Sequence, residues 1–230
     1  MTSKTLVSAV QQAADIAGHD AGYRFLDRKE QALWHPFNAV ASRSACIAAG
    51  LRERGIRSGD TVAIVLPTGP DFIDVFFACN HIGAIPVPMY PPVRLGRLDE
   101  YYEKTAAMLK TCRAQMIVTD VRVGKLLGRV LEHVAPPLGM CRVADVTDTH
   151  PIEPHPADPD DVAMVQFSSG TTGIPKPVAL THRHVISNSM AIIGKLTEKG
   201  PENPSGVSWL PLYHDMGLIG CVFPAVLLPG

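Results

Sequence analysis

The chain has 230 residues, of which 46% are hydrophobic and 19% are charged, and its formal net charge is −1. This composition is typical of a globular chain rather than a disordered one, and the length is enough for one large domain or two small ones. Because there is no block of basic residues, the sequence argues against nucleic acid as the main partner. No apolar run approaches the roughly 18–20 residues that cross a bilayer, so we expect no membrane span.

The cysteines and the two ends of the chain bear on where the protein works. The five cysteines are scattered, and none forms a C-x-x-C pair. Cys46 and Cys79 fall within apolar periodic segments, so we expect reduced thiols in a cytoplasmic protein. No apolar segment typical of a signal peptide follows Met1. Residues 218–230 carry no charge, which is unusual for a terminus, so we expect that the chain has been cut inside or just after a helix.

The first predicted elements alternate between helix and strand. Apolar residues at i, i+3, i+4 and i+7 spacing predict an amphipathic helix over 37–51. The near-continuous apolar run 61–66 is typical of a parallel strand that is covered on both faces. A second helix is predicted to begin at Pro70, with Asp71 and Asp74 in its first turn, where negative charge favours the helix dipole.

The alternation continues as far as a proline-rich segment. Further strands are predicted over 85–89, 116–119 and 141–143, and further helices over 98–112 and 121–134. Residues 147–161 then contain four prolines and are predicted to form a linker. This linker divides the chain into a first α/β part, 1–150, and the start of a second, 162–230.

Beyond the linker the pattern resumes. The predicted elements are a strand over 162–167, a glycine-rich loop, a strand around 178–180, a helix from 181 to about 196 and a strand over 207–209. Strands that alternate with helices at this spacing predict an α/β fold, with a mainly parallel sheet and flanking helices. In such sheets ligands bind beyond the carboxyl ends of the strands, which is where the loop 168–176 leaves its strand.

This loop carries the strongest functional signal of the chain. It reads Phe167-Ser168-Ser169-Gly170-Thr171-Thr172-Gly173-Ile174-Pro175-Lys176. The glycines allow successive backbone N–H groups to point into one concavity, the hydroxyl groups add donors, and the lysine adds a positive charge. That combination suits a polyphosphate, so a nucleotide is the first ligand to consider.

The spacing excludes two common nucleotide motifs. The Walker A pattern needs four residues between its glycines and a serine or threonine directly after its lysine. Here two residues separate Gly170 from Gly173, and Pro177 follows Lys176. The dinucleotide fingerprint G-x-G-x-x-G is also absent. An exposed turn between two strands is the alternative interpretation, but prolines on both sides hold Lys176 in an extended segment, which favours a fixed phosphate contact.

The loop, followed by Thr181-His182, resembles the phosphate-loop signature of the adenylate-forming enzymes, which include acyl-CoA synthetases, luciferases and the adenylation domains of peptide synthetases. Two further segments are similar to the fatty acyl-AMP ligase branch: Pro88-Met89-Tyr90-Pro91-Pro92 with Arg94-Leu95-Gly96-Arg97-Leu98, and Ser208-Trp209-Leu210-Pro211-Leu212-Tyr213-His214-Asp215-Met216-Gly217-Leu218-Ile219-Gly220. The resemblance runs from about Arg24 to Gly230. It implies that 1–230 is a truncated form of the large N-terminal adenylation domain.

The resemblance implies ATP-dependent activation of a fatty acid. The carboxylate would attack the α-phosphate to give an acyl-adenylate and pyrophosphate, and the acyl group would pass to an acyl carrier protein or a polyketide synthase. His214 would lie beside the carboxylate and the α-phosphate. The β- and γ-phosphates would be held by Ser168, Ser169, Gly170, Thr171, Thr172, Gly173 and Lys176. Mg²⁺ is expected with the ATP, because the loop alone cannot neutralise the leaving pyrophosphate; no residue is assigned as a metal ligand.

The resemblance also has limits. The family's adenine-binding segment, its magnesium-binding acidic residue and the catalytic lysine of its small C-terminal domain would lie downstream, so we expect the chain alone to be inactive. Pro177 stands where the family usually has glycine, a difference that bears on nucleotide affinity. A fatty acyl-CoA synthetase is the alternative within the superfamily. A non-catalytic module that binds acyl chains or a carrier protein is the alternative of another class.

Several residues have a structural interpretation beside a functional one. Asp215 is expected to cap a helix that begins at Met216, rather than to form a catalytic pair with His214. His182 and His184 do not share a helix face, so we expect no metal site there. The remaining residues of this kind are expected to pack, cap or face solvent: His81, Arg94, Arg97, Tyr101 and Tyr102.

Overall fold

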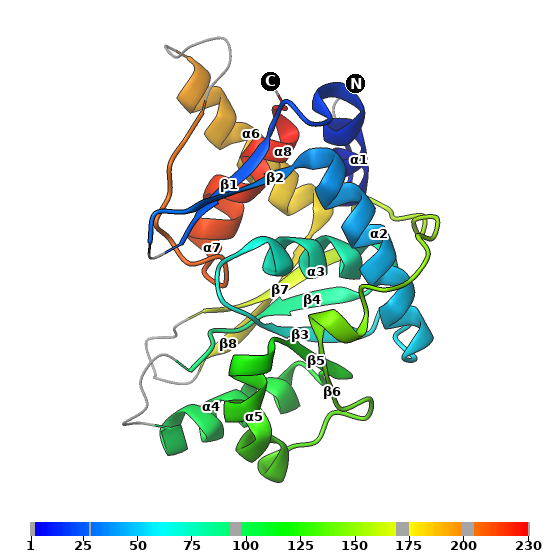
Figure 1. Ribbon diagram of the computed structural model, residues 1–230, viewed down its shortest axis with the longest axis vertical. Helices are drawn as coiled ribbons and strands as arrows, with labels where there is room; N and C mark the ends of the chain where they lie inside the picture. Colours follow the sequence, from blue (N-terminus) through cyan, green and yellow to red (C-terminus); the bar gives the residue numbers. More distant parts are fainter. Residues whose placement is uncertain (1–2, 28, 93–97, 169–174, 199–204, 230) are drawn as a thin grey trace.

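The computed structural model describes residues 3–27, 29–92, 98–168, 175–198 and 205–229 (Figure 1). Within these ranges the centre is a parallel sheet whose strand order is β4 (Ile85–Pro88), β3 (Thr61–Val65), β5 (Met116–Thr119) and β6 (Met140–Arg142). Two antiparallel hairpins complete the described strands: β1 (Gly22–Leu26) with β2 (Ala32–Pro36), and β7 (Val162–Ser168) with β8 (Lys176–Thr181). The predicted α/β class is confirmed.

Helices cover both faces of the central sheet. In Figure 1 two of them lie above the sheet and two below, and their bounds are α2 (Phe37–Glu53), α3 (Pro70–His81), α4 (Leu98–Thr111) and α5 (Val121–His133). Val62 and Ile64 of β3 belong to the core shared with α2 and α3, whereas Ala63 and Val65 belong to the core shared with α4 and α5. Because β3 is buried on both sides, its apolar residues are consecutive instead of alternating.

Beyond β6 the chain makes one 3-10 turn, η2 (Val143–Asp145), and then forms neither helix nor strand over 146–161. The start of this segment packs closely on α2. A Cβ atom at Gly50 would come within 2.5 Å of the carbonyl oxygen of Val146, so the close approach requires glycine. The proposed division of the chain at this segment stays a prediction.

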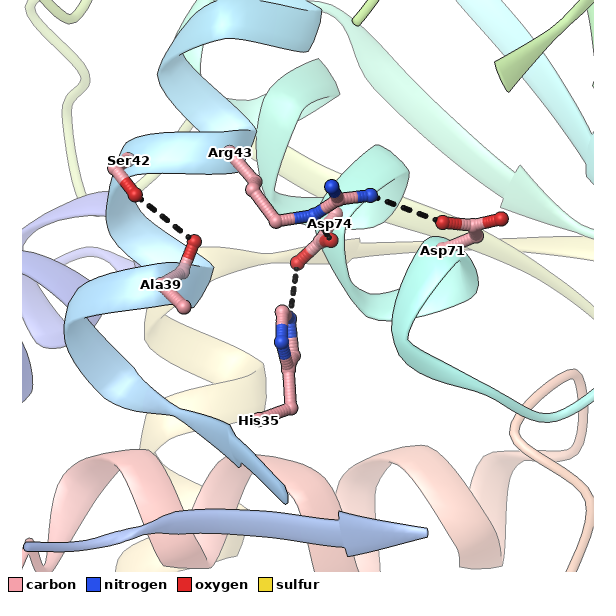
Figure 2. A network of polar contacts seen from close by, with 6 residues as sticks. All are labelled: His35, Ala39, Ser42, Arg43, Asp71 and Asp74. Carbon is pink, nitrogen blue, oxygen red and sulfur yellow. Dashed lines mark hydrogen bonds and ion pairs between the residues drawn. The ribbon is translucent and has the colours of Figure 1, made fainter. Parts of the chain in front are cut away.

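The Asp74 carboxylate is fully buried between β2, α2 and α3 (Figure 2). His35 Nε2 donates to Asp74 Oδ1 at 2.7 Å, and Arg43 Nε donates to Asp74 Oδ2 at 2.6 Å. Arg43 Nη2 also donates to Asp71 Oδ1 at 3.1 Å. The prediction that Asp74 acts on the helix dipole from the first turn is wrong, because only Asp71 lies in that turn. The charge of Asp74 is instead neutralised by side chains from β2 and α2.

The sequence patterns missed the N-terminal elements and predicted one strand that does not form. Helix α1 (Leu6–Ala17) begins with a capping box, in which the Ser8 N–H donates to Thr5 Oγ1, and the β1–β2 hairpin follows it. Residues 205–209, which include the predicted strand 207–209, form no strand, and the Trp209 side chain is 90% exposed. A strand needs a neighbour for its N–H and C=O groups, and the described residues provide none here.

A helical run ends the described chain. It consists of α7 (Asp215–Gly217), a π-helical turn η3 (Leu218–Val222) and α8 (Phe223–Leu227). The Phe223 ring packs on α3, with its centroid 5.4 Å from that of Phe76, and Tyr23 Oη of β1 donates to the Val222 carbonyl at 2.9 Å. None of the described helices is both long and apolar enough to span a bilayer.

Helix α1 is fastened to α6 (His182–Thr197) by a buried histidine. The Leu6 N–H donates to His182 Nδ1 at 3.1 Å, and His182 is only 3% exposed. Burial lowers the pKa of His182 to about 4, because a charged imidazolium would lose its hydration. Protonation of Nδ1 would also remove the acceptor of the Leu6 bond, so the neutral ring is the form that joins α1 to α6.

We expect Asp74→Asn to lower the free energy of unfolding by about 3 kcal/mol, because it removes the buried charge that His35 and Arg43 both contact. Asp71→Asn is the matched control. It contacts the same arginine, but its side chain is 49% exposed, so we expect a loss below about 1 kcal/mol. Urea unfolding followed by circular dichroism measures both variants. Equal losses would show that Asp74 does not hold these elements together.

We expect acid to destabilise the fold through His182. Its folded-state pKa lies below the unfolded value of about 6.5, so as pH falls the unfolded chain takes up the proton first. Stability should be unaffected above about pH 6.5 and should decline toward about pH 4, by up to about 3 kcal/mol. His182→Asn keeps an acceptor near the place of Nδ1 and does not titrate. Urea unfolding across this pH range should therefore show a smaller decline in the variant, and an identical decline would refute the role of His182.

Candidate functional site

The β7–β8 hairpin places two of the predicted phosphate contacts opposite each other. Ser168 ends β7 and Lys176 begins β8, and the two residues are cross-strand partners. Ser168 Oγ donates to the Lys176 carbonyl at 3.4 Å, and both side chains are exposed. The ends of the intervening loop are thus held together, with a hydroxyl and an ammonium group at the exposed end of the hairpin.

The other predicted loop contacts lie outside the described residues: Ser169, Gly170, Thr171, Thr172 and Gly173. Their assignment to the phosphates stays a prediction. Pro177, which departs from the family pattern, lies in β8 and pairs with Phe167. In the described part of the chain no further strand flanks β8, and proline is compatible with an edge strand. The extended backbone at Pro177 therefore accommodates the residue.

His214 lies in a tight turn that leads into the C-terminal helical run. The His214 N–H donates to the Pro211 carbonyl at 3.2 Å, and the Leu218 N–H donates to the His214 carbonyl at 3.1 Å. Gly217 makes this turn possible, because a Cβ atom there would collide with the Pro211 carbonyl oxygen. The turn closes on itself and leaves the His214 side chain 62% exposed, where it is accessible to a ligand.

Two long-range hydrogen bonds fix the backbone that precedes His214. The Leu212 N–H donates to Thr68 Oγ1 at 3.2 Å, and Gln166 Nε2 donates to the Tyr213 carbonyl at 3.2 Å. Thr68 follows the carboxyl end of β3, and Gln166 lies two residues before the carboxyl end of β7. The ends of both strands therefore face one segment, 211–214, which brings His214 to the same side of the molecule as Ser168.

The geometry around His214 determines which of its ring nitrogens can serve a ligand. Nδ1 lies 2.6 Å from Asp215 Oδ1 and 3.3 Å from the Met216 nitrogen. Nδ1 accepts a hydrogen bond from the Met216 N–H, and the Asp215 carboxylate lies beside the same nitrogen. The Met216 N–H also donates to Asp215 Oδ1 at 2.8 Å. Nε2 is the nitrogen left for a ligand.

The cap predicted for this helix is misplaced by one residue. His214, rather than Asp215, occupies the N-cap position, and α7 begins at Asp215. Asp215 still accepts from the Met216 N–H, so its carboxylate does satisfy a donor of the first turn. Since the same carboxylate contacts His214 Nδ1, capping and orientation of the imidazole are combined in one side chain.

Other polar and aromatic residues have structural roles. His182 accepts from α1, and His184 completes the capping box of α6 with Thr181. Within the described ranges, no group of three or more His, Cys, Asp or Glu side chains is placed to hold a metal ion. Tyr101 and Tyr102 lie on the buried face of α4, and His81 Nε2 donates to the Ile152 carbonyl at 2.7 Å. Arg94 and Arg97 lie outside the described residues.

Sequence reasoning missed Gln166 and Thr68. One signal for Gln166 was present, because it is the one amide side chain in the otherwise apolar run 162–167, and a polar group in a buried strand needs a partner. Thr68 gave no comparable signal, since its Thr-Gly-Pro context is common in loops. The partner of each is a backbone group more than 40 positions away, which no local pattern identifies.

Comparison with known proteins adds a family and several relatives. The family described as AMP-binding enzyme matches residues 14–229. The long-chain-fatty-acid–AMP ligase FadD32 of Mycolicibacterium smegmatis is 31% identical over 229 residues, which cover 94% of this chain and 34% of the relative. A putative acyl-CoA synthetase of Caulobacter vibrioides is 31% identical over 189 residues, which cover 80% of this chain and 32% of the relative. The chain thus spans about a third of the length of these curated relatives.

Solved structures share the architecture. One comes from a study of fatty acyl-adenylate ligases of E. coli and L. pneumophila; it has a TM-score of 0.85 and 31% identity, over 98% of this chain and 40% of that one. The adenylation domain of a keto acid-selecting NRPS module, bound to a keto acyl adenylate, has a TM-score of 0.88 and 21% identity, over 100% of this chain and 41% of that one. The second similarity shows the fold alone.

Proposed function

The chain belongs to the family of AMP-binding enzymes, and we propose that it is the N-terminal part of a fatty acyl-AMP ligase, which converts a fatty acid and ATP to an acyl-adenylate. The observation that carries the proposal is the bond between β7, which leads to Ser168, and the segment that carries His214. Relatives named as a long-chain-fatty-acid–AMP ligase and as fatty acyl-adenylate ligases support this class of substrate.

In this proposal the residues of the site stabilise charge. As the fatty acid carboxylate attacks the α-phosphate and pyrophosphate leaves, negative charge grows on phosphate oxygens, and donors already aimed at them lower the barrier. Lys176 and Ser168, together with 169–173, would hold the β- and γ-phosphates. His214 would lie beside the carboxylate and the α-phosphate, with Nε2 toward them because Asp215 engages Nδ1.

Magnesium is expected with the ATP on the strength of the resemblance. Mg²⁺ is usually bound through substrate phosphates and one or two carboxylates, and it keeps several waters. The described residues gather no acidic cluster that would hold the ion without the nucleotide, so they supply no ready-made metal site. We assign no step of the reaction to a metal held by the side chains described.

The acceptor of the acyl group has two candidates. We propose an acyl carrier protein or a polyketide synthase, because segments 88–98 and 208–220 are similar to the fatty acyl-AMP ligase branch. Coenzyme A is the second candidate, since one relative is named a putative acyl-CoA synthetase. A cytoplasmic location stays a prediction that follows from the cysteine pattern.

We expect Lys176→Ala, made in the whole ligase, to lower the rate of pyrophosphate release about 100- to 1,000-fold, because one charged donor to the phosphates is lost. Lys195→Ala is the matched control. Lys195 is 83% exposed on α6 and pairs with Glu198 at 3.2 Å. We therefore expect the Lys195→Ala ligase to release pyrophosphate at a rate within about twofold of wild type. A normal rate for Lys176→Ala, with the fold intact, would contradict the phosphate role.

We expect the 230-residue chain alone to make no acyl-adenylate. It spans about a third of its relatives, and the resemblance places the adenine pocket and the catalytic lysine outside it. The assay traps acyl-adenylate with hydroxylamine in the presence of ATP, Mg²⁺ and a long-chain acid. Acyl hydroxamate above the level of the Lys176→Ala chain would refute this expectation. With the whole ligase, a comparison of coenzyme A and holo-carrier protein as acceptors separates the two candidates.

A further inference from the structure

The side-chain amide of Gln166 is only half satisfied, although its oxygen is buried. Nε2 donates to the Tyr213 carbonyl at 3.2 Å, whereas Oε1 is buried without a hydrogen-bond partner among the described residues. A buried carbonyl oxygen without a donor costs free energy. Methionine, which has a similar length and no polar oxygen, would avoid that cost. The stability of β7 therefore does not account for an amide side chain at position 166. The bond from its Nε2 to the Tyr213 carbonyl does.

That bond joins two parts of the site that are far apart in sequence. Gln166 lies two residues before Ser168, and Tyr213 directly precedes His214. From the end of β3, Thr68 holds the adjacent residue, since its Oγ1 accepts from the Leu212 N–H at 3.2 Å. The backbone before His214 is thus held at two consecutive residues by side chains from two strand ends.

The His214 side chain itself has no comparable support. It is 62% exposed, and the polar contacts that the described residues give it are with its neighbours Asp215 and Met216. These local contacts set the orientation of the imidazole relative to its own turn, but they do not fix the turn relative to the hairpin that carries Ser168 and Lys176. Placement of the imidazole in the site therefore depends on the backbone bonds of the preceding residues.

We propose that Gln166 is a positioning residue that fixes His214 relative to the phosphate-binding end of β7 by holding the Tyr213 carbonyl. The inference rests on the proposed function, in which the carboxylate and the α-phosphate meet beside His214. Gln166 acts through His214 and touches neither substrate. Since a misplacement of about 1 Å can cost about 100-fold in rate, one bond to the backbone is enough to matter.

The structural part is tested on the 230-residue chain by hydrogen exchange and mass spectrometry. In Gln166→Met, amide exchange in the segment 210–218 should become about tenfold faster. The reason is the loss of one of the two hydrogen bonds that Gln166 and Thr68 make to the backbone of this segment. Gln115→Met is the matched control: its Nε2 also donates to a backbone carbonyl at 3.2 Å, that of Arg113, but this bond lies just before β5. The control should leave exchange in 210–218 unchanged. Unchanged exchange in Gln166→Met would overturn the proposal.

The functional part is tested in the whole ligase, with ATP and a panel of long-chain fatty acids. Gln166→Met should lower kcat about 10- to 100-fold and leave KM for ATP within about twofold, without a lower melting temperature. Gln115→Met should match wild type. In a His214→Ala background, Gln166→Met should cause no further loss, because it acts through the residue already removed.

The outcomes separate the two proposals. A full additional loss in the double variant would overturn the positioning role, because Gln166 would then act independently of His214. If the wild-type ligase makes no acyl-adenylate from any acid tested, the proposed function fails. Hydrogen exchange still decides in that case whether Gln166 holds the segment that carries His214.

Discussion

A parallel sheet can exist in this chain only because helices cover both of its faces. Parallel strands cannot be joined by tight turns, so each crossover needs a helix, and α3, α4 and α5 follow β3, β4 and β5 in turn. The crossovers bring the carboxyl ends of the strands to one edge of the sheet. Thr68 follows one of these ends, so the geometry that buries the sheet also supplies the contact to Leu212.

The buried carboxylate of Asp74 connects three elements of the fold, namely α3, β2 and α2. It lies in the second turn of α3, and its partners come from β2 and α2, so a single charge fixes the start of α3 against two other elements. Thr68 lies two residues before α3. The ion pairs that hold the start of α3 are therefore close in sequence to the loop whose Thr68 contacts the segment of His214.

Local sequence patterns were sufficient to predict the helices and strands whose buried residues follow a regular spacing or an unbroken run. Helices α2 to α6 and strands β3 to β8 appear within a few residues of their predicted bounds, because a 3.6-residue period or an unbroken apolar run reports burial directly. The patterns failed where long-range contacts decide. The absence of a strand at 207–209 and the ion pairs of Asp74 depend on neighbours that are distant in sequence. The β1–β2 hairpin is different, because it pairs nearby residues such as Leu26 and Ala32 and was missed although it is local.

Residue types at short, fixed spacing were enough to predict the α/β class, the glycine-rich loop and the resemblance to the adenylate-forming enzymes. The folded chain was needed to see that Asp215 lies beside Nδ1 of His214 and that Gln166 and Thr68 hold the backbone before it. Each bond to that backbone spans more than 40 residues. Which groups become partners depends on how the helices and strands pack together. That packing is a property of the whole chain rather than of any short segment.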